Sequence, residues 1–432
     1  MVNRRQITTS LAVVAAAVAL LGSGTVAAQA KTLTYVGWSQ DEAAMKPTLS
    51  AMFDGYRKAN PDVKLDIIGF PWAQMQQNIL LRMRSKQPLD VVQIQERWLP
   101  QFATTGKLVE LNAVFGKSEL EKRINPGALR LGEFRGKQLG IPWTFGSIGM
   151  VANAKVLADA GVTAPPQTVE AFLAALKAIK KSQPQSVPYA MSTKNNNTMS
   201  PDFQVWLWTF GGKLFDDKGK VLVNSAAGVR ALTFMTDLVK DGLAAKDVDR
   251  PDARRMYAQH QTGFYQDAPL ARGFARNNSG KGKEFDAFVL SMPTPVLRAG
   301  DAPQSLAWGQ LLSMFTDGKG VPGKQSPQAK LITELAMNDA NQLKYFNEQG
   351  LFPTTTTALD QLKENDPYVA VWTAAARSAE RDETAMWPNS AELTTIVGEE
   401  VQSALLGQKS PQAAIESMGK RLEAKMAELP KS

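Results

Sequence analysis

Residues 136–153, which read GKQLGIPWTFGSIGMVAN, contain the features on which the interpretation of the whole chain depends. The stretch opens with a Gly-Lys turn signal and continues into an apolar, strand-like segment at residues 139–142. Aromatic and small residues follow, and a second apolar run covers residues 148–151. This pattern fits two structures: a segment that crosses between lobes beside a cleft, or a buried pair of strands with a bulge at Gly146. The flanking sequence decides between them.

The N-terminal segment has the features of an export signal and not of a folded domain. Two basic residues, Arg4 and Arg5, precede an uninterrupted apolar run at residues 11–21, and Ala-Gln-Ala at residues 28–30 matches a cleavage site. The apolar run is shorter than the about 20 residues that a helix needs to cross a bilayer. We therefore expect cleavage before Lys31 and a mature protein in the periplasm. Because the chain has no cysteine, we expect no lipid anchor.

Composition narrows the chemistry that the protein can perform. The chain has 432 residues, a formal net charge of +8, one histidine and no cysteine. The absence of cysteine excludes disulfides and thiolate metal ligands, and His260 alone is a poor basis for a zinc site or a Ser-His-Asp triad. The charges are scattered, without a block of one sign, which does not favour a nucleic-acid partner. We expect no catalytic residue, no metal and no cofactor.

After the export signal, predicted strands alternate with predicted helices. Apolar residues alternate or cluster as in strands at residues 32–37, 63–67 and 90–94, and they recur with helical spacing at residues 49–56 and 72–83. Alternation of this kind predicts a mostly parallel sheet covered by helices on both faces. Ligands bind such sheets at the carboxyl ends of strands, where the polar loops 38–42 and 95–98 are expected. A solvated loop with a tryptophan on its rim is the alternative for each.

Several segments resemble one family. FDGYRKANPDVKLDI, RMRSKQPLDVVQI and TTGKLVELNAVF, at residues 53–67, 82–94 and 104–115, are similar to the first lobe of extracellular solute-binding proteins that serve ABC-type sugar importers. The similarity, of the maltose-binding-protein-like kind, continues through residues 136–181 and covers essentially all of residues 31–432. Each motif is short, and their order and spacing carry the resemblance. One departure is Leu270, which stands near the place of an aromatic that often stacks on sugar.

The resemblance implies an α/β fold of two lobes, each a mostly parallel sheet flanked by helices, joined by hinge crossovers and followed by a helical C-terminal region. It assigns residues 31–145 and 309–360 to the first lobe, and residues 146–308 and 361–432 to the second. It also implies the substrate-binding component of an ABC importer, a monomer that captures a carbohydrate in the inter-lobe cleft and delivers it to a membrane permease.

Sugar sites combine flat aromatic rings, which stack on pyranose faces, with planar polar groups that bind hydroxyls. Several tryptophans stand beside polar residues at predicted strand ends and crossovers, and the resemblance adds others. The candidate ligand-binding residues are Trp38, Gln40, Asp41, Trp72, Gln74, Gln95, Glu96, Arg97, Trp98, Trp143, Phe145, Asn197, Asp202, Asp267, Trp308, Gly309, Gln310, Trp387 and Asn389. For each tryptophan, packing in the core is the competing interpretation. Asn197 and Asp202 also fit a solvated turn.

Two other functions compete with this one. A secreted glycosidase would need two carboxylates about 5–9.5 Å apart, and the acidic pairs at residues 216–217 and 399–400 fall in a predicted turn and a predicted helix. The same fold carrying a metal or a polyamine is the other alternative. One histidine and dispersed tyrosines argue against iron, and Arg97 argues against a polyamine.

Overall fold

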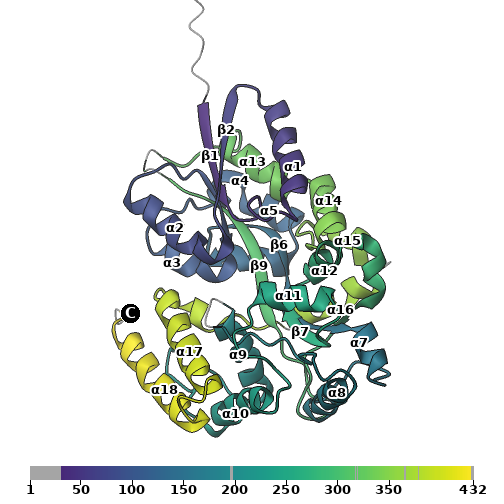
Figure 1. Cartoon of the computed structure of the whole chain (residues 1–432). Coiled ribbons are helices and arrows are strands. Elements are labelled where there is room, and N and C mark those ends of the chain that lie inside the picture. The colour runs from purple at the N-terminus through teal and green to yellow at the C-terminus, as the bar shows by residue number, and fades with distance from the viewer. Residues whose placement is uncertain are drawn as a thin grey trace, which may run out of the picture.

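The computed structural model describes residues 31–429 apart from 195–197, 317, 319, 364–365 and 378. Within them the chain forms a mixed α/β fold of two lobes, drawn one above the other in Figure 1. The predicted export signal lies outside the described residues. Among the described helices, none combines the length and apolar character required to cross a membrane.

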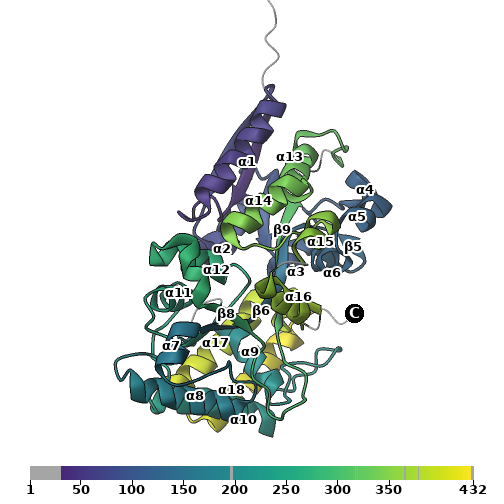
Figure 2. The ribbon, with the colours of Figure 1, turned by 90° about the vertical axis from the view of Figure 1, so that its right-hand side faces the viewer.

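The first lobe begins with the strand and helix alternation that the sequence predicts. Strand β1 (Lys31–Gly37) pairs in parallel with β2 (Val63–Gly69) and with β3 (Val91–Gln95). Helices α1 (Lys46–Ala59) and α2 (Trp72–Arg84) make the crossovers. The apolar stripe of α1 is buried, as its helical spacing predicts. Helices α13 (Pro327–Ala336) and α14 (Asp339–Gln349), from much later in the chain, pack beside α1 (Figure 2).

Most of the stretch at residues 136–153 forms a single crossover strand. Strand β6 (Ile141–Asn153) is buried along its whole length and pairs with β9 (Leu306–Met314). Farther along, β6 pairs with β7 (Phe264–Asp267) and β8 (Val289–Met292), so it enters both lobes. The alternative of two strands with a bulge at Gly146 is therefore wrong. The register shift lies between Pro142 and Thr144.

The expectation of mostly parallel sheets holds only for β1, β2 and β3. The strand order is β2-β1-β3-β9-β6-β7, with β8 also on β6, and every pair involving β6 or β9 is antiparallel. The physical reason is that β6 and β9 run between the lobes in opposite directions. They can therefore be neighbours only as an antiparallel pair.

Two glycines of β6 permit close packing. A Cβ atom at Gly146 would lie 2.7 Å from Cγ of Pro269, and one at Gly149 would lie 3.0 Å from Cζ3 of Trp372. Any larger side chain would displace these neighbours from the crossover.

The remaining elements complete the two lobes and their junction. Around the first lobe lie α3 (Leu99–Ala103), α4 (Asn112–Phe115), α5 (Lys117–Arg123), α6 (Pro126–Leu129), α15 (Thr356–Lys363) and the strands β4 (Glu133–Phe134) and β5 (Lys137–Gln138). The second lobe contains α7 (Ala154–Asp159), α8 (Val169–Ser182), α9 (Met199–Thr209), α10 (Ala226–Lys240), α17 (Ser390–Leu405) and α18 (Pro411–Ala427). Near the junction are α11 (Arg250–Ala258), α12 (Ala271–Ser279) and α16 (Pro367–Arg377). Short 3₁₀ helices are η1 (Glu96–Trp98), η2 (Arg130–Gly132), η3 (Gly282–Phe288) and η4 (Thr384–Met386).

Two hydrophobic clusters hold these elements together. One joins the first lobe to α11, α12 and α16, and it contains Trp143 and Trp372. The other lies between α8, α9, α10, α17 and α18 and contains Trp206. The expected N-caps Thr168 and Ser410 each accept a hydrogen bond from the backbone N–H three residues on. The lobe boundaries along the chain stay a prediction.

Candidate functional site

A pocket of about 190 Å³ lies between the lobes, and we call it the aromatic pocket. Its wall combines the strand ends of the first lobe, strand β9, and residues of α11, β7 and α12. The residues that line it include Trp38, Glu42, Trp72, Gln95, Arg97, Arg250, Arg254, Asp267, Leu270, Phe274, Trp308 and Gln310. The pocket thus lies at the carboxyl ends of β1 and β3, where the strand pattern predicted a ligand-binding position.

Trp38 and Trp72 form an aromatic wall that a third tryptophan, Trp98, supports. The rings of Trp38 and Trp72 each lie against Trp98, with centroid distances of 5.6 and 5.9 Å. Trp98 does not line the pocket and supports the other two from behind. The guanidinium carbon of Arg97 lies 5.6 Å from the centroid of the Trp72 ring. The tryptophan rings therefore form a flat apolar surface beside the cationic side chain of Arg97.

Buried amides fix the position of this wall. Gln93 donates to Oε1 of Gln310 at 2.8 Å, which ties β3 to β9. Gln95 donates to the carbonyl of Gly309 at 2.6 Å, and the Gly309 N–H donates to Glu96 at 2.9 Å. These bonds hold η1 against β9, so the direction of Arg97 is set by the crossover itself.

Two ion pairs form the opposite wall. Arg254 binds Asp267 through two hydrogen bonds of 2.8 and 2.9 Å, and its guanidinium carbon lies 3.8 Å from the Phe274 ring centroid. Arg250 donates to Asp202 at 2.6 Å, and the other oxygen of Asp202 accepts from Ser192 at 2.6 Å. Asp202 lies behind the pocket wall, where it positions Arg250.

Glu42 brings an unusual carboxyl group into the aromatic pocket. Its Oε2 atom is buried and has no hydrogen-bond partner among the described residues. Burial raises the pKa of Glu42 from 4.5 to about 7; Arg254 opposes this rise, whereas Asp267 and Asp41 add to it. Tyr345 is a further titratable group that interacts with it. Glu42 therefore changes charge near neutral pH.

Replacing Glu42 by glutamine is expected to remove a pH-dependent loss of stability. Because folding raises this pKa, the folded protein binds the proton more tightly, and the free energy of unfolding falls as the pH rises from about 4.5 to about 7. At 1.36 kcal/mol per pKa unit, reduced for partial exposure, the loss is about 2–3 kcal/mol. Urea unfolding should find the variant more stable than wild type at about pH 8 and equal to it at about pH 4. A difference that does not change with pH would contradict this assignment.

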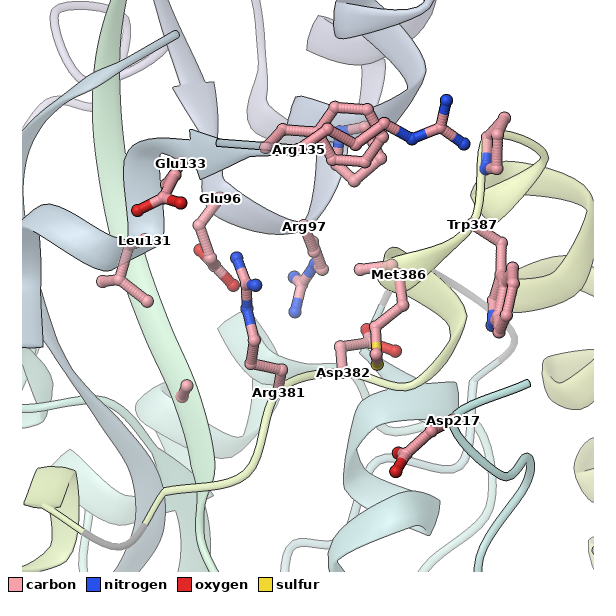
Figure 3. Close-up of a pocket in the computed structure, with 15 residues that line it drawn as sticks. Glu96, Arg97, Leu131, Glu133, Arg135, Asp217, Arg381, Asp382, Met386 and Trp387 are labelled. Carbon is pink, nitrogen blue, oxygen red and sulfur yellow. The ribbon is translucent and has the colours of Figure 1, made fainter. Parts of the chain in front are cut away.

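A second pocket, of about 330 Å³, adjoins the first and also contains Arg97; we call it the charged pocket (Figure 3). Glu96, Arg97, Glu133 and Arg135 line it from the first lobe, and Asp217, Arg381, Asp382, Met386 and Trp387 from the second. In Figure 3 Arg97, Arg381 and Glu96 point toward its centre. With Arg97 common to both, the two pockets together reach the range of about 300–1,000 Å³ that is typical of ligand sites.

Nine of the predicted residues line one of these two pockets. They are Trp38, Trp72, Gln95, Arg97, Asp267, Trp308 and Gln310 in the aromatic pocket, with Glu96 and Trp387 in the charged pocket. Gly309 contributes only its backbone, as described above. Asn197 lies outside the described residues.

The other predicted residues have different environments. Trp143 is fully buried and stacks on Tyr345 at 5.1 Å, so it belongs to the core. Phe145 lines a separate cavity beside Asn125 and Leu359. Gln40 donates to the carbonyls of Gly37 and Ile68, whereas Asp41 and Gln74 are exposed outside both pockets. Asn389 donates to the carbonyl of Lys425. With Trp98 and Asp202, which support the wall from behind, these residues do not line the pockets as the sequence analysis expected, because a polar neighbour does not determine which way a side chain points.

On the wall opposite the tryptophans, sequence reasoning identified Asp267 but missed the other members. Arg250, Arg254 and Phe274 line the aromatic pocket, and so does Glu42. The run RPDARR at residues 250–255 was a signal, since cations near the N-terminus of a helix oppose its dipole. Phe274 lies one helical turn after Leu270, and it supplies the aromatic ring that the earlier position lacks. In the described part of the chain, no three acidic or histidine side chains gather as a metal site would require.

Comparisons with known proteins identify the family of this chain. Residues 40–319 match the family model of the bacterial extracellular solute-binding proteins. The diacetylchitobiose binding protein DasA of Streptomyces coelicolor is 25% identical over 340 residues, which are 77% of this chain and 74% of that protein. The GacH receptor of Streptomyces glaucescens, solved unliganded and with acarbose, has a TM-score of 0.79 at 20% identity and covers 92% of this chain and 99% of its own. Maltose-bound MalE3 of T. maritima has a TM-score of 0.80 at 22% identity, with coverage of 92% and 100%.

These matches confirm the resemblance seen in the sequence, and the structural neighbours share the two-lobed fold. The family model alone covers well over half of the chain. The chain therefore belongs to the bacterial extracellular solute-binding proteins.

Proposed function

We propose that this protein captures a carbohydrate between its lobes and delivers it to the membrane permease of an ABC importer. The observation that carries the proposal is the aromatic pocket, which is lined by Trp38, Trp72 and Trp308 together with Gln95 and Gln310. Apolar rings beside planar hydrogen-bonding groups suit the two kinds of surface that a sugar presents. The relative from Streptomyces coelicolor is named for diacetylchitobiose, and the two structural neighbours hold acarbose and maltose.

The mechanism follows from the origin of the pocket wall. Its residues come from both lobes, and β6 and β9 connect them. A ligand that contacts both walls favours the closed arrangement by the difference between its affinities for the closed and open states. The closed protein would then dock on the permease as a monomer, without a cofactor, a metal or a nucleic acid.

We further propose binding without turnover. Glu42 has an oxygen without a hydrogen-bond partner among the described residues, but a glycosidase needs a pair of carboxylates. Asp267 and Glu96 have other partners: Asp267 is held by Arg254, and Glu96 accepts from the Gly309 N–H. Neither is arranged as the free acid or base of a glycosidase. Cleavage of a bound oligosaccharide beyond one equivalent per protein would refute this proposal.

A thermal-shift screen over monosaccharides, oligosaccharides and polyols tests the function directly. A ligand that binds only the folded state raises the melting temperature, by an amount that grows with its concentration. We expect at least one saccharide to do so. If none does, the carbohydrate proposal is wrong and the fold carries another solute.

Trp72→Ala is expected to lower the affinity for such a saccharide about tenfold. Trp72 is only partly buried, so its truncation removes a stacking surface while disturbing the core little. Stacking contributes about 0.5–1.5 kcal/mol beyond the buried area, and about 1.4 kcal/mol corresponds to a factor of ten. Isothermal titration calorimetry measures the loss, with Trp72→Phe as the variant that keeps a ring. Equal affinities for wild type and Trp72→Ala would remove Trp72 from the site.

We propose that the protein is exported to the periplasm and is free of a lipid anchor, with its leader removed before Lys31. The support is the leader pattern in the sequence and the extracellular family to which the chain belongs. N-terminal sequencing of the exported protein should start at Lys31, and a retained leader would refute the proposal.

A further inference from the structure

Two buried arginines of the aromatic pocket each have a guanidinium nitrogen without a partner. Arg97 is 8% exposed and Arg250 is 6% exposed. The Nη1 atom of each is buried and has no hydrogen-bond partner among the described residues. A buried N–H group without an acceptor is costly, so such groups indicate an acceptor that the protein itself does not supply. Both side chains line the same pocket.

The two arginines come from opposite walls. Arg97 belongs to η1 at the end of β3, and Arg250 is the first residue of α11. Arg250 uses Nη2 for Asp202, and its buried Nη1 has no acceptor among the described residues. Arg97 lies over Trp72, and no carboxylate of the described residues forms an ion pair with it. Guanidinium groups bind carboxylates and other oxyacid anions through parallel N–H···O bonds.

The acidic residues of the pocket do not cancel this charge. Asp267 is neutralised by two bonds from Arg254. Asp249 accepts from the Asp252 N–H, caps α11 and lies 3.7 Å from Lys194. Burial raises the pKa of Glu42 to about 7 and also raises that of Glu96, which weakens both as counter-charges. Asp202 pairs with Arg250 behind the wall, so the charge that remains without an ion-pair partner is that of Arg97, which lies beside Trp72.

We propose that the saccharide bound in the aromatic pocket is acidic, and that Arg97 and Arg250 bind its anionic oxyacid group. This rests on the proposed carbohydrate function and narrows its substrate class. The anion is a carboxylate, as in a uronic acid, or a sulfate or phosphate ester, because all three present coplanar or clustered oxygens to a guanidinium.

The positions of Arg97 and Arg250 also connect the charge of the ligand to the closure of the two lobes. The two guanidinium groups come from opposite walls of the pocket, so an anion that binds both connects these walls. Such an anion gives both Nη1 atoms a charged acceptor, whereas the hydroxyl oxygens of a neutral sugar accept weaker hydrogen bonds. The acidic group thus favours the closed arrangement in addition to the stacking contacts.

The experiment compares matched neutral and acidic sugars on the full mature protein. The probes are glucose with glucuronate, galactose with galacturonate, maltotriose with trigalacturonate, and glucose with its phosphate and sulfate esters. Calorimetry should find at least one acidic probe bound about tenfold or more tightly than its neutral partner, since a charge-assisted bond has about that effect. The uronate, phosphate and sulfate arms identify which oxyacid is preferred.

Arg97→Gln assigns the effect to this site. It should reduce affinity for the preferred acidic probe about tenfold more than it reduces affinity for the neutral partner. Arg97→Lys keeps the charge but lacks the planar fork, so it should recover only part of the loss. The same substitution at an exposed arginine of α1, Arg57→Gln, serves as the control and should change neither affinity. Arg250→Gln is less suitable because it would also leave Asp202 buried without its counter-charge.

The outcomes separate this inference from the function on which it rests. If neutral sugars bind as tightly as their acidic partners, or if Arg97→Gln weakens both equally, the acidic-ligand inference is overturned and carbohydrate binding stands. If no saccharide of either kind binds, the carbohydrate function fails and the inference fails with it. Preference for an acidic probe that Arg97→Gln abolishes confirms both.

Discussion

Trp206→Ala is expected to lower the free energy of unfolding by about 3–5 kcal/mol, because it leaves a large cavity in a packed interior. Trp206 is fully buried in the second hydrophobic cluster. Its ring centroid lies 4.7 Å from that of Phe234 and 6.0 Å from that of Phe172. Its Nε1 donates to the Tyr189 hydroxyl at 3.2 Å, so the substitution also removes a partner from a buried polar group. Urea unfolding of the unliganded protein measures the loss.

Trp206→Phe is the matched control, since it keeps most of the ring volume and should be clearly less destabilising. Trp206 lies in neither pocket, so a folded Trp206→Ala protein should bind saccharide with unchanged affinity. Trp72→Ala should show the converse pattern, with affinity lost and most stability retained. If Trp206→Ala unfolds no more easily than Trp206→Phe, the second cluster is not packed as described.

Asp202→Asn is expected to cost about 3–5 kcal/mol, the typical cost of removing one member of a buried ion pair. The Asp202 side chain is 1% exposed and that of Arg250 is 7% exposed, with 2.6 Å between them. Asparagine keeps the shape of the side chain and can still accept a hydrogen bond from the Ser192 hydroxyl. The loss of stability therefore measures the cost of leaving the Arg250 charge without its counter-charge. Because this pair holds α11 against α9, the variant also tests how the second-lobe wall of the pocket is positioned.

A surface pair provides the control for Asp202→Asn. Asp54 and Arg57 form an ion pair of 2.9 Å on α1, with exposed side-chain fractions of 71% and 44%. Asp54→Asn should change stability by less than about 1 kcal/mol, because solvent screens exposed pairs. Equal effects of the two substitutions would show that the Arg250 charge is not buried as the structure places it.

The local pattern of apolar residues was sufficient to predict the order of strands and helices in much of the first lobe. The alternation of β1, α1, β2, α2 and β3 follows from apolar periodicity, because each element must turn one face to the core. The carboxyl ends of β1 and β3 could then be identified as site positions, and Trp38, Gln95 and Arg97 do line the pockets. The order of the short motifs along the chain was sufficient to identify the family.

The sequence by itself therefore determined the family, the two-lobed α/β fold and one wall of the site, since these depend on residues close together in the chain. Only the tertiary structure decided the direction of β6, the burial of Trp143, and the second wall of Arg250, Arg254 and Phe274. These features depend on contacts between segments far apart in sequence. Gln95 meets Gly309 across 214 positions, for example, and Arg250 meets Asp202 across 48. The spacing of residues along the chain does not predict which side chains such contacts bury and which side chains line the pocket.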